Sequence, residues 1–145
     1  MTRTYRVQCG CGAVQISFGG RPIVHAYCHC IDCRDLLNVP MHAVTAWRDT
    51  DVTVIDPNHR LTEYQHPELD MKRMFCADCG EVLFNTNSPG WRVISQHLIA
   101  KCNGGELPEE LRSNKHFFYE QRVIDIDDGL PKFVRGSDGP LFQEA

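Results

Sequence analysis

Seven of the eight cysteines in this chain of 145 residues fall into three short clusters, and their spacing constrains the fold more than any other feature. The clusters are Cys9-Gly10-Cys11-Gly12, Cys28-His29-Cys30-Ile31-Asp32-Cys33 and Cys76-Ala77-Asp78-Cys79-Gly80, and Cys102 stands alone. Such tight turns allow sulfur atoms to converge within about 4 Å of each other, as a tetrahedral zinc ion requires. Two cysteine pairs supply four ligands, whereas Cys-x-Cys-x-x-Cys presents three sulfurs from one loop and leaves a fourth position open. The clustered cysteines therefore divide as four plus three.

Disulfide bonds are a weaker explanation for these cysteines. Cysteine makes up about 5.5% of the residues, below the roughly 8–10% of small disulfide-stabilised folds, and a chain of this length can bury a core without cross-links. The first twenty residues contain no apolar segment typical of an export signal. We therefore expect a cytoplasmic protein whose thiols persist and bind metal.

Two other interpretations of the clusters remain open. A single Cys-x-x-Cys can be a redox dithiol, although that motif usually lies in a βαβ unit, which this sequence does not suggest. Alternatively, one more side chain completes the second site, so that both zinc ions are structural. The candidates for that side chain are Cys102, His25, His29, His97 and His116. The spacing alone does not decide between an open and a closed second site.

The rest of the sequence predicts one mostly β domain with short helical turns. Runs rich in β-branched and aromatic residues alternate with clusters of Gly, Pro, Asn and Asp, as in chains of short strands. The predicted strands cover residues 4–8, 13–18, 41–47, 52–55, 61–65, 81–84, 91–99 and 116–126. Helical turns are expected at 32–37 and 108–112. The tail from residue 129 onward contains several Gly and Pro residues and is expected to lie on the surface as an arm.

Charge and hydropathy argue against two classes of partner. The net charge is -4, and the basic residues are scattered along the sequence, so nucleic acid is not expected. No run of eighteen apolar residues occurs, so no membrane-spanning segment is expected.

The cysteine clusters and their neighbours resemble the glutathione-dependent formaldehyde-activating enzyme family, which includes centromere protein V. The matching stretches are Cys9-Gly10-Cys11-Gly12-Ala13-Val14, Cys28-His29-Cys30-Ile31-Asp32-Cys33-Arg34 and Arg73-Met74-Phe75-Cys76-Ala77-Asp78-Cys79-Gly80-Glu81-Val82-Leu83-Phe84. Two later stretches, His116-Phe117-Phe118-Tyr119 and Asp128-Gly129-Leu130-Pro131-Lys132-Phe133, are similar to the closing strand and the acidic Leu-Pro signature of the family. The resemblance covers most of residues 5–133.

This resemblance implies a zinc-stapled β-tent domain at residues 1–133, followed by a C-terminal arm at residues 134–145. It implies two zinc ions per chain, a structural one held by Cys9, Cys11, Cys76 and Cys79 and a second, catalytic one held by Cys28, Cys30 and Cys33. The implied activity is that of a carbon–sulfur lyase that forms and cleaves S-hydroxymethylglutathione from glutathione and formaldehyde. A small thiol such as glutathione is the implied partner.

Two features beside the second cysteine cluster are relevant to substrate binding. Arg34 follows Cys33 directly and is the candidate for binding a carboxylate of the substrate. Leu36-Leu37-Asn38 replaces a small, Gly-containing stretch that is common in the family, and we expect it to reshape the pocket.

Other polar and aromatic residues have a structural interpretation. His29 is expected to project away from the zinc, and His116 is expected to be a histidine at the edge of the core with a backbone partner. The carboxylates that precede Gly129, namely Asp125, Asp127 and Asp128, are expected to form a solvated turn. Trp47 and Trp91 are both expected in the core.

The alternative function is not enzymatic. A β domain with two structural zinc sites can serve as an interaction module, and exposed Phe or Leu side chains at residues 130–142 offer a surface for a partner or for a homo-oligomer. An open fourth position at the second zinc distinguishes the enzyme from the module.

Overall fold

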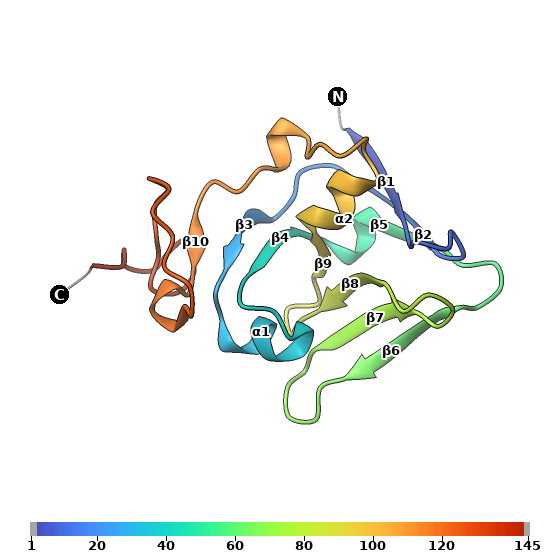
Figure 1. Cartoon of the computed structure of the whole chain (residues 1–145), viewed down its shortest axis with the longest axis horizontal. Helices are drawn as coiled ribbons and strands as arrows, with labels where there is room; N and C mark the ends of the chain where they lie inside the picture. Colours follow the sequence, from blue (N-terminus) through green and yellow to red (C-terminus); the bar gives the residue numbers. More distant parts are fainter. Residues whose placement is uncertain (1–2, 144–145) are drawn as a thin grey trace.

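The computed structural model describes residues 3–143 and contains two β-sheets (Figure 1). The smaller sheet has the strand order β1-β2-β5, with β1 at Thr4–Gln8, β2 at Gln15–Gly19 and β5 at Val52–Ile55. The larger sheet has the order β10-β3-β4-β9-β8-β7-β6. Its strands are β3 (Val24–Cys28), β4 (His42–Trp47), β6 (Leu61–Gln65), β7 (Lys72–Cys76), β8 (Val82–Thr86), β9 (Arg92–Ser95) and β10 (His116–Phe117). A mostly β fold is therefore confirmed.

The core lies where the two sheets meet. Alternate residues of β1 and β2 are buried, as expected for strands with one solvated face. Phe18 of β2 packs edge-on against Trp47 of β4, with ring centroids 4.9 Å apart, and Tyr5 stacks on Phe18. Fully burying one such side chain contributes about 1.5–3 kcal/mol to the free energy of unfolding. The prediction that Trp47 belongs to the core is confirmed.

Two short α-helices fit between the strands. Helix α1 (Ile31–Leu37) begins after Cys30 and ends at Asn38, which adopts a left-handed conformation with φ 56°. This helix confirms the predicted helical turn at 32–37. Helix α2 (Gln96–Lys101) places Leu98 and Ile99 in the core between the sheets.

Helix α2 corrects the prediction of one strand over residues 91–99. The strand β9 ends at Ser95, whose hydroxyl accepts a hydrogen bond from the backbone N–H of His97 and so caps the helix. The predicted strand at 116–126 is also too long. Strand β10 stops after Phe117 because Phe118 has φ 53°, and a 3₁₀ turn follows at Tyr119–Gln121.

Further 3₁₀ turns lie at Asp49–Asp51 and Glu109–Leu111. The second of these falls within the helical turn predicted at 108–112. Strands β3 and β7 were not predicted, although each of them ends at a cysteine of the clusters.

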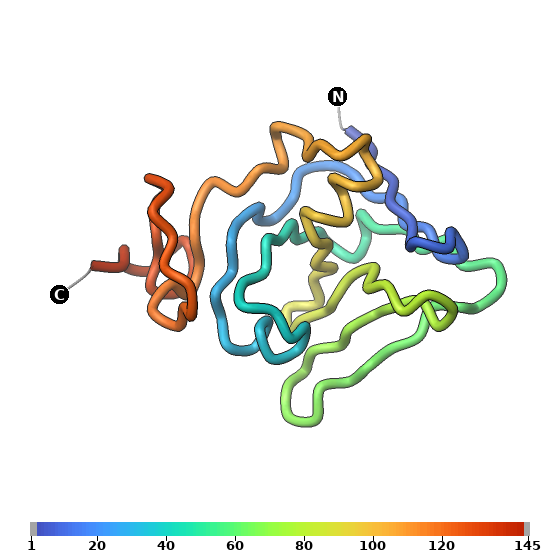
Figure 2. The backbone as a smooth tube through the Cα atoms, viewed as in Figure 1, coloured from blue at the N-terminus to red at the C-terminus, as the bar shows by residue number. Residues whose placement is uncertain are grey.

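The C-terminal segment lies beside β10 at one end of the molecule, in red in the backbone trace (Figure 2). Strand β10 pairs in parallel with β3, and Phe133 donates a backbone hydrogen bond to His116. Phe142 packs edge-on against Tyr119, with ring centroids 5.2 Å apart. The segment predicted as an arm therefore contacts the domain through both backbone and side chains, and the proposed boundary at residue 134 stays a prediction; residues 144 and 145 lie outside the described part.

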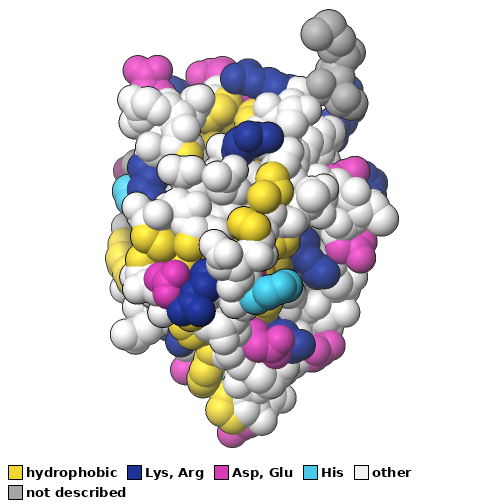
Figure 3. All heavy atoms as spheres, turned by 90° about the vertical axis from the view of Figure 1, so that its right-hand side faces the viewer, with side chains coloured by type: hydrophobic (Ala, Val, Ile, Leu, Met, Phe, Trp, Pro, Cys, Tyr) yellow, Lys and Arg dark blue, Asp and Glu magenta, His cyan; other side chains and the backbone are white. Residues whose placement is uncertain are grey.

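The surface carries charges of both signs. On the face drawn in Figure 3, Lys and Arg side chains are dispersed among Asp and Glu side chains. Within residues 3–143, no helix is long and apolar enough to cross a membrane.

Candidate metal centres and the adjacent cavity

The four-cysteine centre joins the two sheets. Cys9 follows β1 of the smaller sheet, and Cys76 ends β7 of the larger sheet. The Cys9–Cys11 and Cys11–Cys76 sulfur distances are 3.7 and 3.6 Å, and all four sulfurs, including that of Cys79, lie within 4.8 Å of one another. A tetrahedron with zinc–sulfur bonds of about 2.3 Å has edges of about 3.8 Å, so this donor set fits a zinc ion.

Glycines make the turns of this centre possible. Gly12 and Gly80 adopt φ angles of 77° and 79°, which favour glycine over residues with a Cβ atom. Their backbone N–H groups donate to the carbonyls of Cys9 and Cys76, and each cysteine pair is thereby folded into a tight knuckle.

The three-cysteine centre is built from one short stretch of chain. Cys28 ends β3, Cys30 caps α1, and Cys33 lies in the first turn of that helix. The Cys28 sulfur is 3.3 Å from that of Cys30 and 3.9 Å from that of Cys33, and the three sulfurs lie within 4.8 Å of one another. The backbone N–H of Cys33 donates to the Cys30 sulfur at 3.2 Å. The strand end and the helix start thus aim three sulfurs at one point.

The side chains considered as a fourth ligand are not part of this group within the described chain. The sulfur of Cys102 lies 3.5 Å from the carbonyl oxygen of Gln8, beside the core. His25 bonds the backbone carbonyl of Arg112, and His29 and His116 bond each other.

The ionisation of the three thiols is strongly coupled. Hydrogen bonds from Cys28 and Cys33 lower the pKa of the Cys30 thiol to about 3. Cys28 donates a hydrogen bond to Cys30, which raises the pKa of the Cys28 thiol to about 12. The thiols of Cys28 and Cys30 raise the pKa of Cys33. Adjacent thiolates repel each other, so a nearby cation is needed to stabilise all three in the ionised form. A divalent ion such as zinc suits these donors, since it stabilises all three thiolates.

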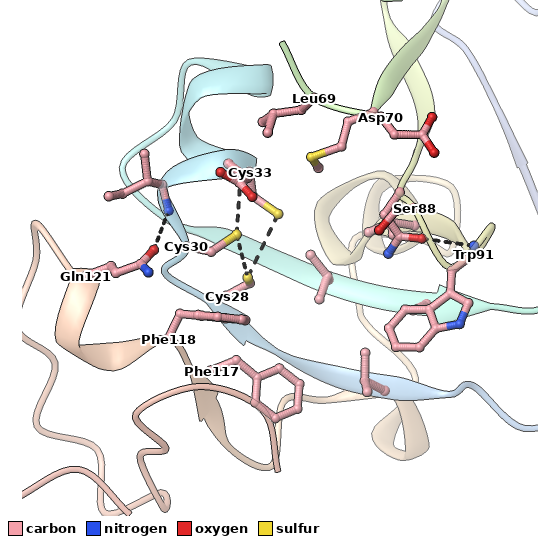
Figure 4. A pocket seen from close by; sticks show the side chains of 18 residues that line it. Cys28, Cys30, Cys33, Leu69, Asp70, Ser88, Trp91, Phe117, Phe118 and Gln121 are labelled. Carbon is pink, nitrogen blue, oxygen red and sulfur yellow. Dashed lines mark hydrogen bonds between the residues drawn. The ribbon is translucent and has the colours of Figure 1, made fainter. Parts of the chain in front are cut away.

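A cavity of about 430 Å³ opens beside the three sulfurs. In Figure 4 the cysteines lie on one side of it and Trp91 lies across from them, with Phe117 and Phe118 on a third side. The remaining lining residues are Val24, Ile31, Asp32, Val44, Ala46, Leu69, Asp70, Met71, Asn87, Ser88, Val93 and Gln121. The prediction that Trp91 belongs to the core is confirmed only in part, because this side chain packs against the buried cluster around Val44 and Val93 but is partly exposed and borders the cavity.

Behind the three-cysteine centre, His29 and His116 form a hydrogen-bonded chain with Asp128. Nε2 of His29 lies 2.8 Å from Nδ1 of His116, and Nε2 of His116 lies 2.8 Å from the Asp128 carboxylate. Both imidazoles are fully buried. Burial is the main cause that lowers the pKa of His29 to about 4, and the neighbouring His116 is the second. The ring of His29 is therefore neutral at pH 7. Burial, the largest single influence, would raise the pKa of Asp128, but hydrogen bonds from His116, the Leu130 backbone N–H and Lys132 together outweigh it and lower the pKa to about 2.

This chain corrects two predictions. His116 has a carboxylate and an imidazole as its side-chain partners instead of a backbone group. Asp128 is not only part of a solvated turn, since it accepts a hydrogen bond from His116 and another from the backbone N–H of Leu130. Asp125 similarly bonds the Tyr119 hydroxyl and Arg122. No motif in the sequence indicated these pairs. The parallel pairing of β10 with β3 brings His116 to His29, whereas the fold of residues 116–130 brings Asp128 to His116 and Asp125 to Tyr119.

The sequence model of the glutathione-dependent formaldehyde-activating enzyme family matches residues 4–121. The chain belongs to this family. The match includes all three cysteine clusters and ends within the 3₁₀ turn at Tyr119–Gln121. Among solved structures, a crystal structure of a Rhodobacter sphaeroides protein is similar, with a TM-score of 0.50 and 24% sequence identity over 71% of this chain and 97% of that chain. That likeness concerns the fold, and no curated protein matches the sequence.

Arg34 and the stretch Leu36-Leu37-Asn38, which the sequence predicts at the pocket, do not line the cavity. The Arg34 guanidinium donates to the backbone carbonyls of His29 and Gln121, at 3.2 and 2.7 Å, and does not line the cavity. Leu36 is fully buried, and neither Leu37 nor Asn38 borders the cavity. A substrate-binding role for Arg34 stays a prediction that its present contacts do not favour.

Proposed function

We propose that this protein is a zinc-dependent carbon–sulfur lyase that forms and cleaves the adduct of a thiol and an aldehyde at the three-cysteine centre. The observation that carries the proposal is the convergence of the sulfurs of Cys28, Cys30 and Cys33 at the wall of a cavity. Family membership adds glutathione and formaldehyde as the reference pair of substrates. The four-cysteine centre takes the structural role, so that two zinc ions bind each chain of a β-tent domain in the reducing cytoplasm.

The reaction is an addition without net oxidation. The sulfur of the substrate thiol attacks the carbonyl carbon of the aldehyde, a carbon–sulfur bond forms, and the carbonyl π bond breaks. The carbonyl oxygen takes up a proton, and the thiol loses one, so the product is a hydroxymethyl thioether when the aldehyde is formaldehyde. Cleavage is the reverse. A zinc ion held by three thiolates would supply the positive charge that keeps the substrate sulfur ionised at neutral pH.

The residues around the sulfurs have two tasks in this proposal. Cys28, Cys30 and Cys33 would hold the zinc ion, and the backbone N–H of Cys33 fixes the position of the Cys30 sulfur. Trp91, Phe117 and the other apolar walls of the cavity limit access of water. Because free aldehydes hydrate in water, a dry wall favours the carbonyl form that the sulfur attacks.

Cobalt substitution tests the open position directly. A cobalt ion with three cysteine sulfurs changes its visible absorption when a fourth sulfur replaces water, whereas a cobalt ion with four cysteine sulfurs has no position to exchange. We expect an added thiol to change the spectrum of the cobalt-substituted protein. The spectrum of a Cys30→Ser variant, which keeps only the four-cysteine centre, should not change.

A second measurement tests turnover. The condensation of formaldehyde with glutathione, followed by exchange spectroscopy of ¹³C-formaldehyde, should proceed faster with the zinc-loaded protein than without it. If no thiol alters the cobalt spectrum at millimolar concentration and no thiol condenses faster with the protein, the enzyme is excluded, and a module with two structural zinc ions becomes the better explanation.

A further inference from the structure

The cavity beside the three-cysteine centre is poor in groups that could bind an anion. Among the described residues that line it there is no Lys, Arg or His, and the only charged side chains are the carboxylates of Asp32 and Asp70. Most of the wall consists of aliphatic and aromatic side chains, with Trp91, Phe117 and Phe118 as the largest.

The polar wall residues are partly committed to the protein itself. The side-chain oxygen of Asn87 accepts a hydrogen bond from the backbone N–H of Trp91, and that of Gln121 accepts one from the backbone N–H of Ile31. These two bonds fix the loop before β9 and the start of α1 at the rim of the cavity.

The charged groups that line the cavity all carry negative charge. Three thiolates around a divalent ion carry a net charge of -1, to which Asp32 and Asp70 add two more negative charges. The cations next to lining residues in the sequence have other partners. Arg34 donates to backbone carbonyls, and Arg92 donates to the carbonyl of Gly90. Arg122 donates to the Asp125 carboxylate, and Lys72 pairs with Glu63. Lys115 lies over the Phe117 ring, 5.7 Å from its centroid. An anionic ligand would therefore lose its hydration in this cavity without gaining an ion pair.

Glutathione carries two carboxylates, which require cationic or N–H partners when they are bound. We propose that the substrate thiol of this protein is instead one with an apolar, preferably aromatic or branched body and no negative charge. The proposal rests on the proposed function, and it adds the chemical class of the substrate. It assigns Trp91 as the residue that selects the apolar body, and Asp32 and Asp70 as the residues that reject anions.

A matched set of thiols tests this with the zinc-loaded protein. Benzyl mercaptan and 4-(mercaptomethyl)benzoate differ by a single carboxylate, glutathione is the reference, and benzyl alcohol lacks the sulfur. Binding is measured by calorimetry and by tryptophan fluorescence. Trp47 is fully buried in the core, so a change on binding reports on Trp91, and a Trp91→Phe variant should abolish it.

We expect benzyl mercaptan to bind at least about ten-fold more tightly than either 4-(mercaptomethyl)benzoate or glutathione. If either anionic thiol binds as tightly, the inference is overturned while the thiol site of the proposed function stands. If none of the thiols binds, the proposed function fails together with the inference. Equal binding of benzyl alcohol and benzyl mercaptan would also contradict both, because the sulfur would then contribute nothing.

Two variants test which residues cause the preference for an uncharged, apolar thiol. The double variant Asp32→Asn with Asp70→Asn should narrow the preference for benzyl mercaptan over the benzoate by about three-fold, since each surface charge contributes only modestly. Asp49→Asn is the matched control, an exposed carboxylate outside the cavity, and should leave the ratio unchanged. Trp91→Ala should weaken the binding of benzyl mercaptan by about ten-fold and leave the binding of glutathione unchanged. An unchanged affinity for benzyl mercaptan would show that Trp91 does not select the apolar body.

Discussion

The two cysteine centres use the same donor atom in opposite ways. The four-cysteine centre gathers sulfurs from two sheets, with Cys11 and Cys76 in contact across 65 positions of the sequence. The three-cysteine centre takes its sulfurs from the end of β3 and the first turn of α1. The first arrangement exists only when the whole fold exists, whereas the second requires little more than one strand end and one helix start. This difference separates a centre suited to holding the fold from a centre suited to facing a ligand.

The largest effect is expected from breaking the four-cysteine centre. Structural zinc contributes on the order of 10 kcal/mol to folding in small domains, and here it would fasten the smaller sheet to the larger one. A Cys76→Ser or Cys9→Ser variant should therefore be insoluble or unfolded by circular dichroism. A soluble Cys76→Ser protein that melts cooperatively and retains two zinc ions would contradict the assignment.

A smaller structural effect with a complete loss of activity is expected at the three-cysteine centre. Serine is a good helix cap, so Cys30→Ser should preserve the start of α1 while it removes one metal ligand. We expect a folded protein with one zinc ion per chain, a cost of about 1–3 kcal/mol and condensation at the uncatalysed rate. Elemental analysis combined with thermal melting checks this. Unfolding as severe as that of Cys76→Ser would show that the two centres are equally structural.

A smaller loss of stability is expected when the His116–Asp128 hydrogen bond behind the three-cysteine centre is weakened. Asp128→Asn removes the charged partner of His116, and because the carboxylate is partly exposed we expect a cost of about 1 kcal/mol. Asp127→Asn, at the exposed neighbouring position, is the control and should be neutral. Chemical denaturation of both variants at pH 7 measures the difference. Equal stability of the two would mean that the His116–Asp128 hydrogen bond is not a significant anchor of the loop.

The smallest effect is expected at the cysteine outside both centres. Cys102 packs at the edge of the core, and its sulfur lies 3.5 Å from the backbone carbonyl oxygen of Gln8. Cys102→Ser should keep two zinc ions per chain and lose less than about 1 kcal/mol. Loss of one zinc ion in this variant would show that Cys102 closes the second centre, and the comparison between a closed and an open centre would fail.

The sequence was most informative where the structure depends on local chemistry. Strands β5 and β6 match their predicted bounds, and the cysteine spacing correctly divides the sulfurs into sets of four and three. The apolar run at 91–99 was ambiguous because it suits a strand and a buried helix equally well, and the capping hydroxyl of Ser95 decides where one becomes the other. Phe118 could not be foreseen in a left-handed conformation, which is uncommon for an aromatic residue.

The cavity depends on contacts that no local pattern encodes. Leu69, Trp91 and Phe117 come from three separate segments, and they meet beside Cys28 only when strands β7, β8, β9, β4, β3 and β10 have paired. The stretch Leu36-Leu37-Asn38 was expected at the pocket because it adjoins Cys33, but α1 buries Leu36, leaves Asn38 exposed at its end, and keeps all three residues out of the cavity lining. Closeness to Cys33 in the sequence thus does not predict which residues line the cavity, whereas cysteine spacing predicts which sulfurs lie together.

The family match ends at Gln121, and the chain beyond it packs on the segment that lies beside the three-cysteine loop. Asp128 bonds His116, the backbone of Phe133 bonds the same residue, and Phe142 covers Tyr119. The terminal stretch thus acts on the three-cysteine loop through a relay, because His116 in turn bonds His29, which lies between Cys28 and Cys30. A change in this stretch is therefore a way for an engineer to retune a thiol site from a distance, with every cysteine left in place.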